Sequence, residues 1–306
     1  MSITANDVKV LRERTGSGMM DCKKALVACD GDMEAATDWL RKKGLAAASK
    51  KAARVTSEGA IAVYSCGTHA TVLEVNAETD FVARNDKFQN YVQTVAKLAC
   101  ESNCDLEALK ALTYPGTEHS VQDELVNLIA IIGENLSLRR VEHISVSEGS
   151  ISTYVHNKLA DGLGKIGVLV GLETSCKCPS IEALGKQIAM HIAAANPHVL
   201  SISDLPADVV ARERAVVTEQ AKASGRPENV IEKMVTGRLN KFYEEVVLLE
   251  QVFVIDGKSK VKDVIAQASK ECGCEVKLTG FKKFVLGEGI EKTSVDFAAE
   301  VAAQLK

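Results

Sequence analysis

The chain has 306 residues, of which 46% are hydrophobic and 25% are charged, and its formal net charge is −4. This composition is typical of a globular protein of roughly two to three domains, and the absence of a basic excess argues against a generic nucleic-acid binder. No apolar run is long enough to cross a bilayer, and residues 1–10 carry neither a signal-peptide nor a presequence pattern. We therefore expect a cytoplasmic protein that does not bind membranes.

Residues 1–43 are expected to form three short helices, a unit so small that it suits docking better than catalysis. Thr4 can cap the first helix with Asp7 as its capping-box partner, and residues 15–18 end that helix. Met19 and Met20 then open the second helix. Adjacent helical residues cannot both face one core, so we expect one methionine at the surface, either as a contact residue or at the edge of the core.

The next segment, residues 44–58, is rich in Ala, Ser, Lys and Arg and shows no apolar periodicity. Its basic residues would suit contact with an acidic surface. A solvated linker between two domains explains the composition better, and we predict a linker here.

An internal repeat follows, with an offset near ninety residues. Residues 58–64 parallel 148–154, and residues 72–79 parallel 167–174, which aligns Glu78-Thr79 with Glu173-Thr174. Each copy predicts two strands followed by an amphipathic helix. We therefore expect an α+β fold with two related core subdomains built on small antiparallel sheets, over 59–140 and over 141–203 with 244–286.

The connection after the second strand of the first copy contains Thr79, Asp80, Phe81 and Val82. Such connections lie on the surface and often carry function. Phe81 could fold back beneath its own sheet, but the second copy has Ser175-Cys176-Lys177 in the aligned place and keeps no comparable apolar residue. We therefore predict an exposed Phe81 that faces a partner.

The remaining elements are expected in the following order. Between the two copies, an apolar helix over 125–132 ends at Gly133 and leads into a strand over 136–141. Residues 204–243 predict a helical hairpin that either projects toward a second copy of the chain or folds flat on its own subdomain. Strands are expected over 246–255, 275–278 and 281–286, and the C-terminal module, 287–306, is expected to hold a helix that opens at Thr293 with Asp296.

The sequence offers no reaction centre. The nine cysteines include no Cys-x-x-Cys pair, so we expect nine reduced thiols used as small hydrophobic side chains, with metal binding as the less favoured alternative. The stretch 162–165 lacks the first glycine and the Ser or Thr of a P-loop, and no zincin motif or nucleophile elbow is present. We expect a binding protein without a cofactor, and an enzyme is the third choice.

Two long motifs resemble the bacterial elongation factor Ts family. They are Thr79-Asp80-Phe81-Val82-Ala83-Arg84 and the stretch LRERTGSGMMDCKKAL at 11–26. Residues 132–135 and 287–292 are similar as well. The motifs follow the family order over essentially the whole chain.

The resemblance implies a guanine-nucleotide exchange factor for elongation factor Tu in translation elongation. It implies an N-terminal ubiquitin-associated-like helical domain, a two-part core, a coiled-coil insertion and a C-terminal module. The aromatic residue of the segment that contains Thr79, Asp80, Phe81 and Val82 would displace the helix that supports magnesium on the GTPase, so that GDP leaves.

The same resemblance implies further contacts with the GTPase. Arg12, Met19 and Met20 would dock the GTPase domain, and Ile132 and Gly133 would make an additional contact. Apart from the resemblance, the 204–243 hairpin could join two copies of the chain into a homodimer or a dimer of heterodimers, and a one-to-one complex is the alternative.

A nucleic-acid or ribosome-binding module is the alternative from another class. It would use the basic segment 44–58 and the arginines of the hairpin. Glutamates interleave with those arginines, which weakens this interpretation, and we expect no direct nucleic-acid contact.

Overall fold

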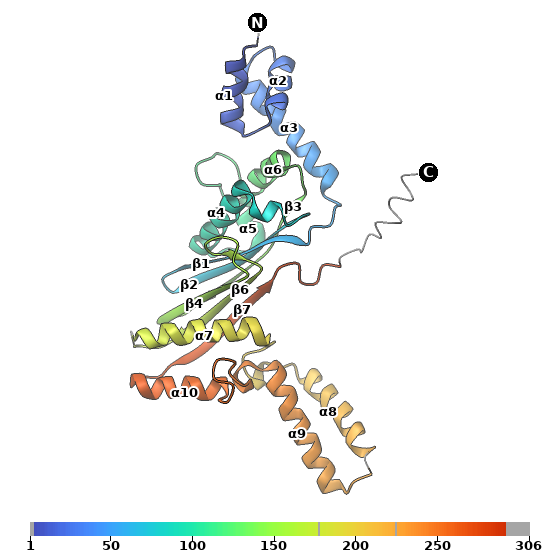
Figure 1. The fold of residues 1–306 in the computed structure, drawn as a ribbon, viewed down its shortest axis with the longest axis vertical. Helices are drawn as coiled ribbons and strands as arrows, with labels where there is room; N and C mark the ends of the chain where they lie inside the picture. Colours follow the sequence, from blue (N-terminus) through green and yellow to red (C-terminus); the bar gives the residue numbers. More distant parts are fainter. Residues whose placement is uncertain (1–2, 177, 224, 292–306) are drawn as a thin grey trace.

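The computed structural model describes residues 3–176, 178–223 and 225–291 of an elongated molecule (Figure 1). Helices form one end, two antiparallel sheets with their covering helices form the middle, and a helical hairpin forms the other end. This is the predicted α+β class. The exact limits of the six predicted segments remain predictions.

The N-terminal end consists of α1 (Ala5–Thr15), α2 (Met19–Ala28) and α3 (Met33–Lys51). The capping box predicted for α1 is present, because the Asp7 N–H donates to Thr4 Oγ1 at 3.2 Å and the Thr4 N–H donates to Asp7 Oδ2 at 2.8 Å. The small core of the three helices comprises Val8, Leu11, Cys22, Ala25, Leu26, Ala36 and Leu40.

Helix α3 extends further than the sequence indicates, because the predicted linker 44–58 is helical as far as Lys51. A Cβ atom at Gly44 would lie 3.3 Å from the Cβ of Ala130 in α6 (Val121–Ile132), so the two helices approach closely there. One turn later Ala48 is buried in the core of the first sheet. Small residues permit this packing but produce no apolar stripe, which is why the composition suggested a linker.

The first sheet has the strand order β3-β2-β1-β5, and its strands pair antiparallel. The strands are β1 (Glu58–Cys66), β2 (His69–Ala77), β3 (Leu136–Ser145) and β5 (Leu163–Gly164). Helices α4 (Asp86–Ser102), α5 (Leu106–Ala111) and α6 pack on it (Figure 1). Their shared core is the largest in the described chain and includes the fully buried Phe88 and Leu73.

The second sheet has the order β4-β6-β7, with β4 (Gly149–His156), β6 (Ile166–Glu173) and β7 (Lys277–Val285). Helix α7 (Pro179–Ala195) packs on it, and α10 (Val261–Cys272) lies beside α7 (Figure 1). The two sheets meet through a separate core that includes Ile61, Val72 and Leu169.

Two strand predictions in the C-terminal half are wrong. The strands predicted over 275–278 and 281–286 form the single strand β7. The strand predicted over 246–255 is instead the last residue of α9 (Glu228–Val246) followed by the 3-10 helix η3 (Leu248–Glu250). Val247 and Leu248 are fully buried, and a short buried apolar run has no periodicity that separates a strand from a helix end.

The repeat is visible in the structure at Gly59 and Gly149. Both residues have a left-handed φ, +122° and +131°, and a Cβ atom on either would clash with the carbonyl oxygen of Val75 or of Leu172. Gly59 pairs with Asn76 and Gly149 pairs with Glu173. The sequence alignment of Glu78 with Glu173 is therefore wrong by two residues, although the repeat itself is confirmed.

The hairpin is formed by α8 (Ala207–Lys222) and α9, and the 3-10 helix η2 (Ile202–Asp204) precedes it. Val217, Ala221, Val235 and Leu239 form its own core between the two helices. Figure 1 shows the hairpin projecting away from the sheets. Of the two predicted arrangements, it does not fold flat on its own subdomain. The helix predicted to open at Thr293 lies outside the described residues.

The expectation of nine reduced cysteines is wrong for one pair. Cys176 and Cys274 are joined by a disulfide, although 98 positions separate them in the sequence. The sequence alone does not bring them together, because one follows β6 and the other follows α10.

Candidate functional site

The loop between β2 and α4, residues 78–85, is longer than the corresponding loop between β6 and α7, residues 174–178. The additional length holds the 3-10 helix η1 (Val82–Arg84), in which the Asn85 N–H donates to the Val82 carbonyl at 2.9 Å. Asn85 Oδ1 then caps α4 by accepting the Lys87 N–H at 3.0 Å. The loop is thus fixed by local hydrogen bonds at its C-terminal end.

Phe81 stands outside this turn. It is 80% exposed, whereas Val82 and Ala83 directly after it are each only 4% exposed. Val82 belongs to the core of the first sheet, and Asp80 is exposed on the other side of Phe81. The buried Val82 therefore anchors the loop while Phe81 projects into solvent, and the prediction that Phe81 is exposed is confirmed.

The N-terminal end of the loop is held by the segment that follows α6. The Thr79 hydroxyl donates to Glu134 Oε1 at 2.8 Å, and the Thr79 N–H donates to Glu134 Oε2 at 3.0 Å. Glu78 Oε1 accepts the backbone N–H of Asn135 at 2.6 Å and lies 3.3 Å from Arg54 Nη1. The two segments thus bind each other reciprocally, through a carboxylate from each side.

Ile132 and Gly133 lie at the start of this supporting turn. Ile132 is half-buried as the last residue of α6, and the exposed Gly133 ends that helix with a φ of +90°. Its N–H donates to the Ile129 carbonyl at 2.9 Å, as expected for a glycine that closes a helix. The structure therefore brings the predicted residues 132–133 next to the predicted residues 79–82.

The predicted docking residues at the N-terminus are exposed. Arg12 lies on the surface of α1, and Met19 and Met20 are 43% and 64% exposed at the start of α2. The sequence predicts one exposed methionine, whereas both are accessible in the structure. Along the same helix, Val27 is 58% exposed.

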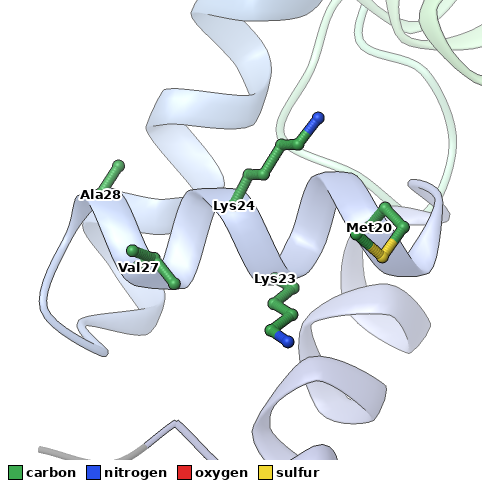
Figure 2. Close-up of a pocket in the computed structure, with 5 residues that line it drawn as sticks. All are labelled: Met20, Lys23, Lys24, Val27 and Ala28. Atoms are coloured by element: carbon green, nitrogen blue, oxygen red, sulfur yellow. The ribbon is translucent and has the colours of Figure 1, made fainter.

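Part of this surface of α2 is hollowed. Figure 2 shows a pocket of about 280 Å³ that Met20, Lys23, Lys24, Val27 and Ala28 line. Exposed apolar side chains such as Met20 and Val27 are typical of a contact surface, and the lysines between them would attract an acidic partner. Lys23 and Val27 extend the predicted docking surface by two helical turns.

The two surfaces are connected through the turn between α1 and α2. Lys87 Nζ, in the first turn of α4, lies 3.5 Å from the Gly16 carbonyl oxygen. A Cβ atom on Gly16 would lie 3.2 Å from Ile131 Cδ1, next to Ile132. The turn that separates Arg12 from Met19 therefore contacts the start of α4 and the end of α6. These are the two helix ends that flank the Phe81 loop and its supporting turn.

Apolar side chains, among them Phe81, Met20 and Val27, are exposed on these surfaces. Across residues 3–176, 178–223 and 225–291, no three His, Cys, Asp or Glu side chains are grouped so that they could hold a metal ion. In that same described part of the chain, none of the helices has the length and apolar character needed to span a bilayer. Glu78 and Glu134 are both used in structural hydrogen bonds.

Four residues of this region are not among those predicted from the sequence: Glu78 and Glu134, which support the loop, and Lys23 and Val27, which belong to the α2 surface. The signal for Val27 was present, since Met20 and Val27 are seven residues apart on one helix face. The Glu134 contact spans 55 residues and has no local pattern.

Comparison with known proteins gives consistent matches. The family model described as Elongation factor TS matches residues 78–288. A protein of Rhodospirillum rubrum named Elongation factor Ts is 57% identical over 305 residues, which cover 99% of each chain. Proteins with the same name from Rhodospirillum centenum and Paramagnetospirillum magneticum are 56% and 58% identical, and the matches cover 97–99% of the chains compared.

Proposed function

Because the chain belongs to the elongation factor Ts family, the nucleotide exchange factors for elongation factor Tu in translation elongation, we propose that it acts on that GTPase through Thr79, Asp80, Phe81 and Val82. In this proposal it binds the GDP-bound GTPase, promotes GDP release and remains on the nucleotide-free form. The observation that supports it most directly is the Phe81 side chain, which is 80% exposed on a loop with buried, hydrogen-bonded neighbours.

The proposed mechanism acts on the magnesium ion of the GTPase. Phe81 enters a pocket on the partner and displaces the helix that supports the ion, so that magnesium loses its coordination. A divalent ion at phosphate is among the largest local charges in a nucleotide site, and its loss lowers the affinity for GDP. No covalent step is required, and this chain acts as an exchange factor rather than as a catalyst of bond making.

The energetics of exchange favour a loop that is already ordered. Factor and GDP each weaken the binding of the other by the same free energy. The more binding energy the factor gains on the GTPase, the more it can lower the affinity of the GTPase for GDP. Immobilising a flexible segment on binding would consume part of that energy. The hydrogen bonds of Thr79 and Asn85 fix the loop before the partner arrives.

The N-terminal helices supply affinity in this proposal. Arg12, Met19 and Met20 dock the GTPase domain, and Lys23 and Val27 extend that contact along α2. Ile132 and Gly133 contact the partner beside Phe81, because their turn is bound to the Phe81 loop. The Gly16 contact with Lys87 keeps the docking surface close to the loop.

Ion pairs within the basic segment 44–58 and directly before it favour this function over nucleic-acid binding. Arg41 lies 3.6 Å from Asp123, Lys43 lies 2.5 Å from Asp21, and Arg54 lies 3.3 Å from Glu78. Cations that are already paired within the chain neutralise fewer phosphates, so fewer counterions are released from a nucleic acid and its binding is weaker. We therefore propose that the chain makes no direct nucleic-acid contact.

The test is the release of a fluorescent GDP analogue from purified elongation factor Tu. We expect the wild-type chain to accelerate release and Phe81→Ala to reduce the second-order rate constant by about 30- to 1,000-fold, since truncating a buried aromatic costs about 2–4 kcal/mol. Ile255→Ala, which removes an apolar side chain that is also exposed, is the control and should leave the rate unchanged.

The three outcomes separate the parts of the proposal. Loss of acceleration in Phe81→Ala alone supports both the function and the site. Equal acceleration by wild type and Phe81→Ala would keep the exchange function and reject Phe81 as its lever. No acceleration by the wild-type chain would reject the function.

A further inference from the structure

Two Cys-x-Cys pairs meet at one end of the second-sheet subdomain. Cys176 and Cys178 precede α7, and Cys178 is the residue directly before its first turn. Cys272 is the last residue of α10, and Cys274 follows two positions later. Helices α7 and α10 lie side by side (Figure 1), which brings the start of one to the end of the other.

The four sulfur atoms are paired crosswise. Cys176 is bonded to Cys274, and Cys176 Sγ also lies 3.6 Å from the Cys272 carbonyl oxygen. The segment that carries Cys178 contacts Cys272 as well, because the hydroxyl of Ser180, two positions further on, lies 3.4 Å from Cys272 Sγ. The first cysteine of one pair is thus bonded to the second cysteine of the other, and the two remaining thiols, Cys178 and Cys272, belong to the segments on either side of this bridge.

The remaining thiols are positioned for exchange with a small reagent. Cys178 and Cys272 are both half-buried at the edge of the core that holds Leu184 and Ile265, so one side of each stays accessible. Ser180 Oγ lies 3.4 Å from Cys272 Sγ and supplies a polar neighbour. Two free thiols are fewer than the four ligands of a structural zinc site, since Cys176 and Cys274 are used by their own bond.

We propose that Cys178 and Cys272 are a redox-active dithiol that closes into a second disulfide beside Cys176–Cys274. The thiolate of one cysteine attacks a low-molecular-weight disulfide such as oxidised glutathione, forms a mixed disulfide and releases one thiol. The second cysteine, as its thiolate, attacks the protein sulfur of that mixed disulfide and releases the second thiol. The two protein thiols are oxidised, and the small disulfide is reduced to two thiols.

The second bridge would act locally. A disulfide stabilises a protein mainly according to the length of chain that it closes, and Cys176–Cys274 already closes 98 positions. A further bond between Cys178 and Cys272 closes little additional chain. It would instead fix the first turn of α7 to the last turn of α10. This modification is independent of the proposed exchange function.

The sequence allows the two bridges to be told apart by peptide mapping. Trypsin cleaves after Lys177 and therefore separates Cys176, in peptide 166–177, from Cys178, in peptide 178–186. Cys272 and Cys274 remain together in peptide 271–277. The full chain is equilibrated with mixtures of reduced and oxidised glutathione, free thiols are alkylated, and the protein is digested without reduction.

We expect peptide 178–186 to be alkylated in reducing mixtures and to become linked to peptide 271–277 as the oxidised fraction rises. Hydrogen exchange at the start of α7 and the end of α10 should slow in parallel. Cys178→Ser and Cys272→Ser should each abolish the second link while the link of peptide 166–177 to 271–277 persists in Cys178→Ser. Cys29→Ser, in the N-terminal helices, should change neither link.

Two results would overturn the proposal. One is a Cys178 that stays alkylated, or ends as a glutathione adduct, in every mixture, which would show that the two thiols do not react with each other. The other is stoichiometric zinc in the purified wild-type chain that is lost in Cys178→Ser, which would make the four cysteines a metal site.

Discussion

The Glu134 carboxylate accepts two hydrogen bonds from Thr79, from the hydroxyl at 2.8 Å and from the backbone N–H at 3.0 Å. One side chain thus binds both hydrogen-bond donors of the residue that begins the proposed active segment. The contact spans 55 positions of sequence and joins two segments for which separate contacts with the partner are predicted. Their proximity suggests that they act as one surface.

Glu134→Ala is therefore expected to weaken exchange without removing any group that touches the partner. The Thr79 N–H and hydroxyl lose their acceptor, which costs about 1–3 kcal/mol, and the loop becomes more mobile. The rate of GDP release should fall less than in Phe81→Ala, and hydrogen exchange of residues 79–84 should accelerate. Glu107→Ala, which removes an exposed carboxylate from α5, is the control; unchanged loop exchange in Glu134→Ala would contradict the supporting role.

Gly133→Ala tests the turn that carries Glu134. The φ of +90° is disfavoured for a residue with a Cβ atom, so the substitution should lower the free energy of unfolding by about 1–3 kcal/mol. Gly237→Ala is the matched control, because Gly237 lies inside α9 and an added Cβ would meet no atom of the described residues within 4 Å. Urea denaturation should show stabilisation there of about 0.5–1 kcal/mol; destabilisation by both variants would contradict the argument.

These positions show how far the sequence could predict the site. Thr79, Phe81 and Gly133 each stand in a local motif, and the exposed Phe81 follows from a connection between a strand and a helix. Glu134 also lies in a motif, at 132–135, but its contact with Thr79 could not be predicted there, because that contact depends on how β2 and α6 are placed in three dimensions. Sequence patterns report neighbours along the chain, and pairing across 55 positions lies beyond them.

The fold, too, contains elements that could be predicted from local sequence patterns and elements that could not. The strands β1, β2, β4 and β6 were predictable because each copy of the repeat carries its own pattern. The second half of α3 was not, since Gly44 and Ala48 pack through their small size and leave no periodic stripe. The Cys176–Cys274 bond was not predictable either, because it depends on the packing of α10 against α7.

A third prediction concerns Glu74, which is fully buried in β2 with two arginines. Arg139 Nη1 lies 3.1 Å and Arg140 Nε 2.5 Å from its carboxylate, and the Gly287 N–H donates to it at 2.8 Å. Glu74→Gln should cost about 3–5 kcal/mol in urea denaturation, because it removes the buried negative charge that lies between two half-buried guanidinium groups. Glu142→Gln, on neighbouring β3, removes the exposed partner of Lys282 and should cost less than about 1 kcal/mol.

The pH dependence of stability follows from the same group. Burial acts to raise the pKa of Glu74, but the hydrogen bonds from Gly287, Asn76 and Arg140 outweigh it and hold the pKa below the ordinary value of 4.5. A depressed folded pKa means that the contribution of Glu74 to stability is present above pH 4.5 and is lost as the pH falls through the folded value. The difference in unfolding free energy between wild type and Glu74→Gln should therefore shrink in acid; a difference that grows would contradict this sign.

The last prediction concerns the α8–α9 hairpin, whose two ends are fixed to each other. The His198 N–H donates to the Val246 carbonyl at 2.8 Å, and the Leu248 N–H donates to the Val199 carbonyl at 2.9 Å. The chain therefore enters and leaves the hairpin at one place, and replacing residues 210–239 by a short Gly-Ser linker should leave both sheets folded. The cooperative unfolding transition followed by circular dichroism and the Phe81-dependent release of GDP should be retained, while the helical signal falls by the share of the removed helices.

The same variant tests self-association through the hairpin. The hairpin closes its own core, yet Val216 on α8 remains an exposed apolar residue that a second copy could cover. If the hairpin joins two complexes, light scattering should give a mass for the wild-type chain with elongation factor Tu that rises with concentration, and the shortened chain should stay at one-to-one. Val216→Asp should lower the mass in the same way without altering the fold, because the side chain is exposed. A wild-type mass that stays at one-to-one across concentrations would instead leave the hairpin as a projecting arm within a single complex, and the exchange function would be carried by the Phe81 loop and the N-terminal helices alone.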